Sequence, residues 1–168
     1  QVAAMLADLP CSIARVGVMV DVDPAAALAW ATAAGVDRIQ LCGVQRAEDW
    51  IEFPLPVWRR VGVDAEGAAE IEAWSKVAEL FVLDHPATPG GSGRNVDFVQ
   101  AARLARTAPC LLAGGLGADN VAAAIAAVQP YGVDASSRLE TQPGRKNPAE
   151  VLAYVRAAQQ ALGAPNLS

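Results

Sequence analysis

Two turns of small residues near the end of the chain could together hold a phosphate group. Gly114 and Gly115 follow a short apolar run, and glycine lets the backbone approach a ligand closely. The helix predicted over residues 119–128 directs amide N–H groups and the positive end of its dipole toward this turn. Ser136 and Ser137 form the second turn, where two hydroxyl groups follow a predicted strand. If the strands before the turns are parallel neighbours, both turns lie at one edge of the sheet, and a dianion fits between them.

Asp84 is the candidate for proton transfer. It directly follows the apolar run of Phe81, Val82 and Leu83, so its carboxyl group lies at the end of a buried strand. A structural role for Asp84, as a loop cap or as a salt-bridge partner, would explain its position equally well. The neighbouring His85 is the only histidine, and we expect a structural role for it, because adjacent strand residues point to opposite faces.

The loop after Asp84 is rich in glycine and proline. The sequence Pro-Gly-Gly-Ser-Gly-Arg over residues 89–94 is more flexible than a plain connection needs, and Gly91 and Gly93 could let it close over a ligand. The alternative is an ordinary surface loop.

The composition restricts the class of protein. The 168 residues suit one domain spanning residues 1–168, and 53% hydrophobic residues with a mean hydropathy of +0.25 exclude disorder. No apolar run approaches the roughly 18 residues of a membrane span, so we expect no membrane partner. A net charge of -5 argues against a nucleic-acid surface. Cys11, Cys42 and Cys110 lack the CxxC spacing of a zinc site, so we expect no metal, no cofactor and a reducing cytoplasm.

Apolar runs alternate with helical patterns along the whole chain, which favours a parallel sheet. Strands are predicted at residues 15–20, 38–42, 57–63, 80–83, 111–113 and 131–135, and helices at 24–34, 47–51, 66–74, 97–106, 119–128 and 147–161. An open doubly wound sheet binds near a strand-order switch, whereas (β/α)8 barrels commonly place a phosphate site on their last strands. The paired turns therefore favour an α/β fold, a (β/α)8 TIM barrel with about six β/α units in this chain. A complete barrel has two more strands, so we expect the first two units to be absent from this sequence.

Five segments of the sequence carry a resemblance to a known family. The segments LDHPATPGGSGRNVDF, LLAGGLGADNVAAAI and QPYGVDASSRLETQPGRKNP are similar to three consecutive signature segments of phosphoribosylanthranilate isomerase. RVGVMVD and DRIQLCG resemble the third and fourth strands of this family at the usual spacing. The similarity keeps this order from about residue 15 to residue 154, which makes it far more specific than one glycine-rich turn.

The resemblance implies an isomerase of tryptophan biosynthesis that performs an Amadori rearrangement of N-(5-phosphoribosyl)anthranilate. This chemistry needs an acid to protonate the ribose ring oxygen and a base to remove the C2′ proton. By resemblance, Asp84 is the acid. The expected partner is this small phosphoribosyl substrate, and the protein is expected to be a monomer or a homodimer. The residues that the resemblance assigns to the substrate phosphate are Gly114, Gly115, Asp134, Ser136 and Ser137.

The base of the family is a cysteine in a KICG-like motif at the end of its first strand. This sequence contains no such motif. We therefore expect the sequence to be part of a longer chain, with a natural short remnant as the alternative.

Several residues depart from the family pattern. Cys42 stands in a QLCG segment where the family usually has QLHG, and a small apolar filler is a more ordinary role for it than a replacement base. Arg59 takes the place of a strand-end lysine. Arg138 replaces a glycine beside the phosphate turn, where it could add a charge-assisted contact. The residues expected at the mouth of the active site are Gln40, Cys42, Arg59, Gly91 and Gly93.

Two alternative functions stay open. Another phosphosugar barrel enzyme, such as ribulose-phosphate epimerase or indole-glycerol-phosphate synthase, would need metal ligands or strand-end lysines. The single histidine and the two lysines, Lys76 and Lys146, fit neither pattern. A non-catalytic phosphate-binding remnant or scaffold of the isomerase family is favoured by the missing base and by Arg138.

Overall fold

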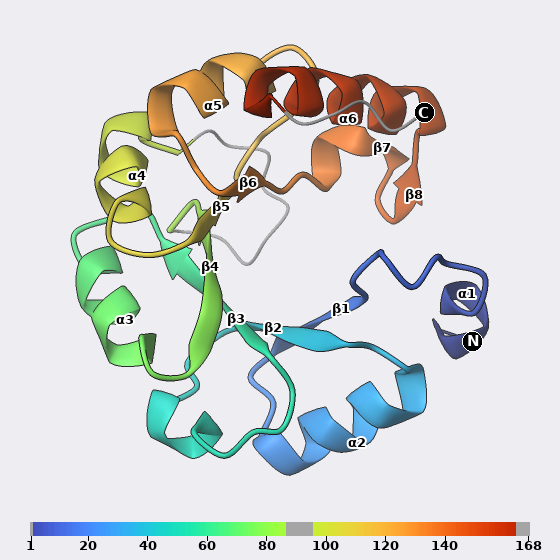
Figure 1. The fold of residues 1–168 in the computed structure, drawn as a ribbon, viewed down its shortest axis with the longest axis vertical. Helices are drawn as coiled ribbons and strands as arrows, with labels where there is room; N and C mark the ends of the chain where they lie inside the picture. Colours follow the sequence, from blue (N-terminus) through green and yellow to red (C-terminus); the bar gives the residue numbers. More distant parts are fainter. Residues whose placement is uncertain (1, 87–95, 164–168) are drawn as a thin grey trace. The chain divides into compact units, whose positions relative to one another are not determined.

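The computed structural model of the protein describes residues 2–86 and 96–163, and Figure 1 shows strands alternating with helices. The predicted loop residues Gly91 and Gly93 lie outside the described residues. Within the described part, no helix is long and apolar enough to cross a membrane.

The elements in chain order are α1 (Val2–Leu6), β1 (Val16–Val20), α2 (Pro24–Ala34), β2 (Arg38–Cys42), the 3-10 helix η1 (Ala47–Trp50), β3 (Val57–Gly62), α3 (Gly67–Trp74), β4 (Ala78–Asp84), α4 (Phe98–Ala105), β5 (Cys110–Leu112), α5 (Val121–Val128), β6 (Gly132–Val133), the 3-10 helix η2 (Ser137–Leu139), β7 (Glu140–Gln142), β8 (Arg145–Lys146) and α6 (Pro148–Leu162).

The longest helices begin and end at residues that favour helix caps. The Ala26 amide donates to the Asp23 side chain at 2.9 Å, and α2 ends at Gly35, whose φ of 72° is the left-handed conformation that glycine tolerates. In α6, Asn147 is the N-cap and Gly163 follows the last turn. The Asp-Pro and Asn-Pro pairs therefore mark both helix starts, as the sequence predicts.

The six main strands follow one another in chain order, β1-β2-β3-β4-β5-β6. The pairs β1–β2, β2–β3, β4–β5 and β5–β6 are parallel. A helix or helical turn follows each of these strands. This arrangement confirms the predicted parallel sheet with about six β/α units.

The chain divides into two compact units. Unit 1 comprises Gln1–Arg60 and Glu72–Leu80, and unit 2 comprises Val61–Ile71 and Phe81–Ser168. The single domain expected for residues 1–168 stays a prediction.

In unit 1, α2 packs closely against β1. A Cβ atom added at Gly17 of β1 would lie only 2.6 Å from the Trp30 ring of α2, so this close approach requires glycine. On the neighbouring strand β2, which pairs with β1 over its full length, Ile39 and Leu41 are completely buried. This packing fixes β2, the strand that carries Gln40 and Cys42.

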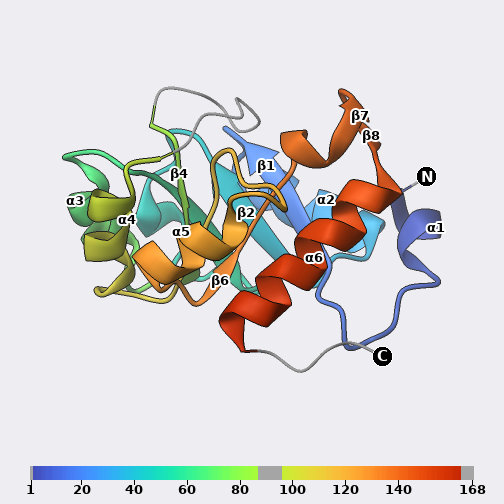
Figure 2. The same cartoon turned by 90° about the horizontal axis from the view of Figure 1, so that it is seen from above.

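In unit 2, α4, α5 and α6 lie side by side (Figures 1 and 2). The buried residues of α5 recur at the spacing of one helix face. They are Val121, Ala124, Ile125 and Val128. Because Leu112 of β5 is also completely buried, the core of this unit fixes β5, α5 and the turn between them.

Two features of unit 2 differ from the sequence prediction. Strand β6 covers only Gly132–Val133 rather than residues 131–135, because the chain turns into η2 at Ser137. The hairpin β7–β8 follows η2, and a turn at Gly144 with φ of 79° closes it. No sequence pattern predicts this hairpin, since its strands are too short to show an alternation.

Candidate active site

The turn after β5 offers backbone donors to an anion. Gly114 and Gly115 have φ angles of 86° and 67°, a left-handed conformation that residues with a Cβ adopt only with strain. Asn120 holds the turn, because its Nδ2 donates to the Gly115 carbonyl at 2.9 Å and its Oδ1 accepts from the Gly117 amide at 2.8 Å. Among the described residues, none accepts a hydrogen bond from the amides of Gly114, Gly115 or Leu116. These three donors are therefore available to a ligand.

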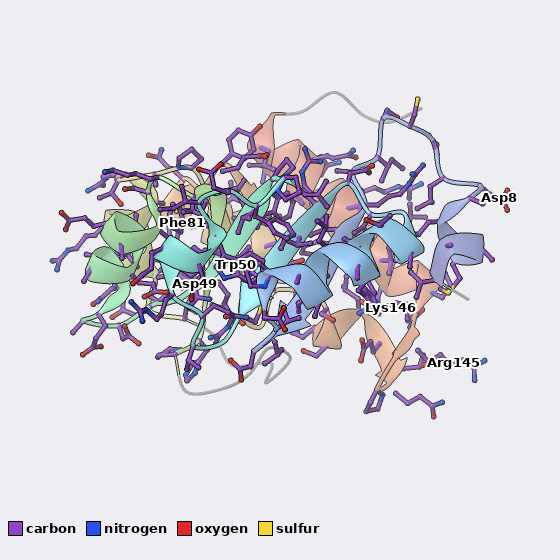
Figure 3. All side chains as sticks on the ribbon, turned by 90° about the horizontal axis from the view of Figure 1, so that it is seen from below. Asp8, Asp49, Trp50, Phe81, Arg145 and Lys146 are labelled. Carbon is purple, nitrogen blue, oxygen red and sulfur yellow. The ribbon has the colours of Figure 1, made fainter. Side chains whose placement is uncertain are left out.

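The turn after β6 is held by a lysine from the β7–β8 hairpin. Lys146 Nζ donates to the Ser136 hydroxyl at 2.9 Å and to the Ser136 carbonyl at 3.0 Å, and it pairs with Glu140 at 2.7 Å. An ammonium group can only donate, so the Ser136 oxygen accepts here and its own O–H remains able to donate to an anion. Lys146 and its neighbour Arg145 follow one another in β8 (Figure 3). The hairpin therefore orients a serine of the predicted phosphate turn.

The structure brings the two turns to the same edge of the sheet. β5 and β6 pair in register up to Leu112 and Val133, so both strands end at the same level. Arg138 of the second turn reaches the first turn, where its Nη1 donates to the Gly115 carbonyl at 3.2 Å. The glycine turn and the serine turn are therefore neighbours, as a shared phosphate site requires.

Asp84 is the last residue of β4 and Asp134 directly follows β6, and these two strands flank β5. The Asp84 carboxyl group accepts a hydrogen bond from the His85 amide at 2.8 Å, and the Asp134 amide donates to the Leu112 carbonyl at 2.8 Å. Both carboxyl groups thus lie at the strand ends next to the phosphate turns.

The carboxyl group of Asp134 has a raised pKa. Desolvation by the surrounding protein raises it most, and the negative charge of Asp84 raises it further, while Lys146 and the Ala135 amide act in the opposite direction. The Asp134 residue is partly exposed to solvent, so this desolvation comes from the atoms packed around its carboxyl group and not from complete burial of the residue. The sequence alone does not pair Asp134 with Asp84, because their proximity depends on the order of β4, β5 and β6 in the sheet.

In unit 1 the predicted mouth residues lie on two faces of the sheet. Gln40 and Cys42 share one face of β2, where Gln40 Nε2 donates to the Cys42 Sγ at 3.5 Å. Arg59 is in register with Leu41 and therefore lies on the opposite face. The structure does not bring Arg59 together with Gln40 and Cys42. Arg60, the next residue of β3, shares their face.

Arg59 is a buried cation with a structural position. Its guanidinium donates to the Gly43 carbonyl at 2.6 Å and to Gln45 Oε1 at 3.0 Å. It also lies 4.5 Å from the centre of the Trp74 ring, a distance that allows a cation–π interaction. The arginine therefore holds the segment that follows Cys42.

The thiols and carboxylates of the described residues do not form a metal centre. No group of three or more His, Cys, Asp or Glu side chains in residues 2–86 and 96–163 could hold a metal ion. Cys11 is exposed, whereas Cys42 and Cys110 are buried free thiols. Burial raises the pKa of Cys110 to about 11, so this thiol is protonated at neutral pH.

Comparisons with known proteins identify relatives that match almost the whole chain. A family model described as N-(5'phosphoribosyl)anthranilate (PRA) isomerase matches residues 3–157. The N-(5'-phosphoribosyl)anthranilate isomerase of Desulforudis audaxviator (strain MP104C) is 37% identical over 165 residues, which are 95% of this chain and 79% of that protein.

Two solved structures show the same fold. One contains monomers of the dimeric phosphoribosylanthranilate isomerase from Thermotoga maritima, with a TM-score of 0.82 and 26% identity. The other is a phosphoribosylanthranilate isomerase in complex with reduced 1-(o-carboxyphenylamino)-1-deoxyribulose 5-phosphate, with a TM-score of 0.82 and 25% identity. Each match covers 95% of this chain and 78% of the solved chain, which confirms the (β/α)8 TIM-barrel class. Because sequence and fold agree over almost its entire length, this chain belongs to the N-(5'-phosphoribosyl)anthranilate isomerase family.

Proposed function

We propose that this protein converts N-(5-phosphoribosyl)anthranilate to 1-(2-carboxyphenylamino)-1-deoxyribulose 5-phosphate, an Amadori rearrangement in tryptophan biosynthesis. The observation that carries the proposal is the arrangement of unit 2, where Asp84 ends β4 and two donor-rich turns follow the neighbouring strands β5 and β6. Opening a phosphorylated sugar ring requires an acid held at a fixed position relative to a phosphate site.

The substrate phosphate binds between the glycine turn and the serine turn. The amides of Gly114 and Gly115 and the hydroxyls of Ser136 and Ser137 supply its donors. Several fixed donors stabilise a dianion better than mobile ones, since they need no reorganisation on binding. The support for this proposal is that side chains from outside each turn already hold the backbone in place.

Asp134 acts on the sugar side of the site, next to Asp84. A carboxylate repels a phosphate dianion, and the amide of Asp134 already donates to the Leu112 carbonyl. Its raised pKa makes Asp134 a second group that can hold a proton beside the proposed acid. In this proposal Asp84 protonates the ring oxygen, and Asp134 shapes the charge around it.

The resemblance assigns removal of the C2′ proton to a cysteine of a KICG-like motif, which this sequence does not contain, so the C2′ proton has to pass to a base outside this sequence, such as solvent water. Cys110 does not take that role, because its thiol is protonated at neutral pH. We further propose that the protein acts in the cytoplasm on this small-molecule substrate, as a monomer or homodimer.

Titration calorimetry with reduced 1-(o-carboxyphenylamino)-1-deoxyribulose 5-phosphate tests the proposal. We expect saturable binding that inorganic phosphate weakens by competition. Ser136→Ala should reduce the affinity about tenfold, since it removes a hydrogen bond to a charged group. The matched control is Ser12→Ala, at an exposed serine of unit 1. Absence of binding, or binding that phosphate does not affect, would contradict the proposed site.

A further inference from the structure

Arg138 connects the two turns of the proposed phosphate site. From the serine turn, its Nη1 donates to the Gly115 carbonyl at 3.2 Å, and its Nη2 donates to Asp119 at 2.9 Å. Both partners belong to the segment between β5 and α5. One side chain therefore joins the segments that follow two neighbouring strands.

The glycine turn leaves space for this guanidinium. A Cβ atom added at Gly117 would lie 3.2 Å from Arg138 Cζ and 3.3 Å from its Nε, closer than ordinary van der Waals contact. The guanidinium therefore lies against the bare backbone at Gly117. With 38% of its side chain exposed, Arg138 is covered over more than half of its surface.

Asp119 keeps the guanidinium in this position. Its hydrogen bond with Arg138 lowers the pKa of the Asp119 carboxyl group below the usual range, so Asp119 is ionised at neutral pH. An exposed ion pair of this kind adds little to the stability of a fold. Its consequence is local, because it determines where the two turns lie relative to each other.

We propose that Arg138 is a positioning residue, which fixes the distance between the two halves of the phosphate site. The inference rests on the proposed function. Binding a dianion between two turns must order both of them, and a link that exists beforehand removes part of that cost. Asp119 balances the charge of Arg138, so the effect comes from order rather than from net attraction.

Titration calorimetry with inorganic phosphate as the probe tests this role. We expect Arg138→Gly to weaken phosphate binding about three- to tenfold. The KM for N-(5-phosphoribosyl)anthranilate should rise by a similar factor, with kcat within about twofold of the unmodified protein. Arg138→Lys keeps the charge without the guanidinium fork, and should recover part of the affinity. The matched control is Arg156→Ala, at an exposed arginine of α6.

A Ser136→Ala variant separates failure of this inference from failure of the proposed function. If Ser136→Ala weakens phosphate binding and Arg138→Gly, folded by circular dichroism, does not, the positioning role is refuted and the site stands. If neither change weakens binding, the phosphate site fails and the inference fails with it. A fall in kcat that exceeds the rise in KM would also overturn the positioning role, because it would place Arg138 in the chemical step.

Discussion

Replacing Gly117 with alanine should displace Arg138 without changing any charge. The added methyl group would lie 3.0 Å from Asp119 Oδ1 and 3.2 Å from Arg138 Cζ, whereas atoms in contact prefer about 3.5–4.0 Å. Both neighbours must therefore retreat by a few tenths of an ångström. If Arg138 moves about 0.3 Å away from the Gly115 carbonyl, their bond, now 3.2 Å, lengthens to about 3.5 Å, at the limit of a hydrogen bond.

The fold should tolerate this substitution. Gly117 is not among the glycines with positive φ, so alanine meets no backbone strain there. The side chains that must move are partly or largely exposed. Gly117 itself is buried, but the side chains over it can move outward, so we expect the free energy of unfolding to fall by at most about 1 kcal/mol. Phosphate affinity should nevertheless fall about three- to tenfold, as for Arg138→Gly.

A double-mutant cycle of Gly117→Ala and Arg138→Gly decides whether this reasoning is correct. If the alanine acts by displacing Arg138, it has no further effect on phosphate affinity in the Arg138→Gly protein. Calorimetry gives the affinity and urea unfolding gives the stability of all four proteins. Equal losses of affinity with and without Arg138 would refute the reasoning, and so would a loss of stability above about 1 kcal/mol.

Three further predictions concern other parts of the protein. The raised pKa of Asp134 means that the folded protein binds more protons than the unfolded one above about pH 4, so this carboxyl group makes stability fall as the pH rises. Asp134→Asn should remove this contribution in urea unfolding between about pH 4 and pH 7, and an unchanged pH dependence would count against it. Iodoacetamide at about pH 8 should alkylate the exposed Cys11 and spare the buried Cys110, because burial raises the pKa of the Cys110 thiol to about 11. Rapid labelling of Cys110, detected by mass spectrometry, would disprove its burial. Trp74→Ala should lower the free energy of unfolding, measured in urea, by about 3–5 kcal/mol, because the buried ring packs against the Arg59 guanidinium. A loss below about 1 kcal/mol would contradict that packing.

Local sequence signals were enough to predict much of the fold. The Asp-Pro pair at Asp23 fixes the start of α2, and the glycine pair after β5 has the positive φ angles that only glycine adopts easily. Both are properties of a few adjacent residues, so no knowledge of the tertiary structure is needed. The apolar runs predict the strands for the same reason, with β2 at residues 38–42 as expected.

The face on which a strand residue lies was harder to predict. Arg59 was placed at the active-site mouth by resemblance to a strand-end lysine. Because side chains alternate along β3, Arg59 lies on the same face as the buried residues Val57 and Val61. The pairing of β3 with β2 places Leu41 on this face as well. Counting residues from the buried valines would have indicated this face from sequence alone.

Contacts between distant segments were beyond prediction from sequence. The hairpin β7–β8 has strands of three and two residues, so it shows no alternation, yet it supplies Lys146 to Ser136. The influence of Asp84 on Asp134 depends on the order of β4, β5 and β6 in the sheet. Neither contact leaves a local pattern, because each joins residues that only the folded sheet brings together.

The central claim is that Asp84 is the acid of phosphoribosylanthranilate isomerisation. The most direct measurement is the rate at which the protein consumes N-(5-phosphoribosyl)anthranilate, followed by the fluorescence of the substrate. The proteins to compare are the unmodified chain, Asp84→Asn and the control Asp8→Asn, an exposed carboxylate of unit 1 (Figure 3). We predict turnover above the buffer rate for the unmodified protein and the control, and a rate about 10²- to 10⁴-fold lower for Asp84→Asn with binding of the reduced product retained. Turnover by Asp84→Asn within about threefold of the unmodified protein, or no turnover by the unmodified protein, would contradict the claim.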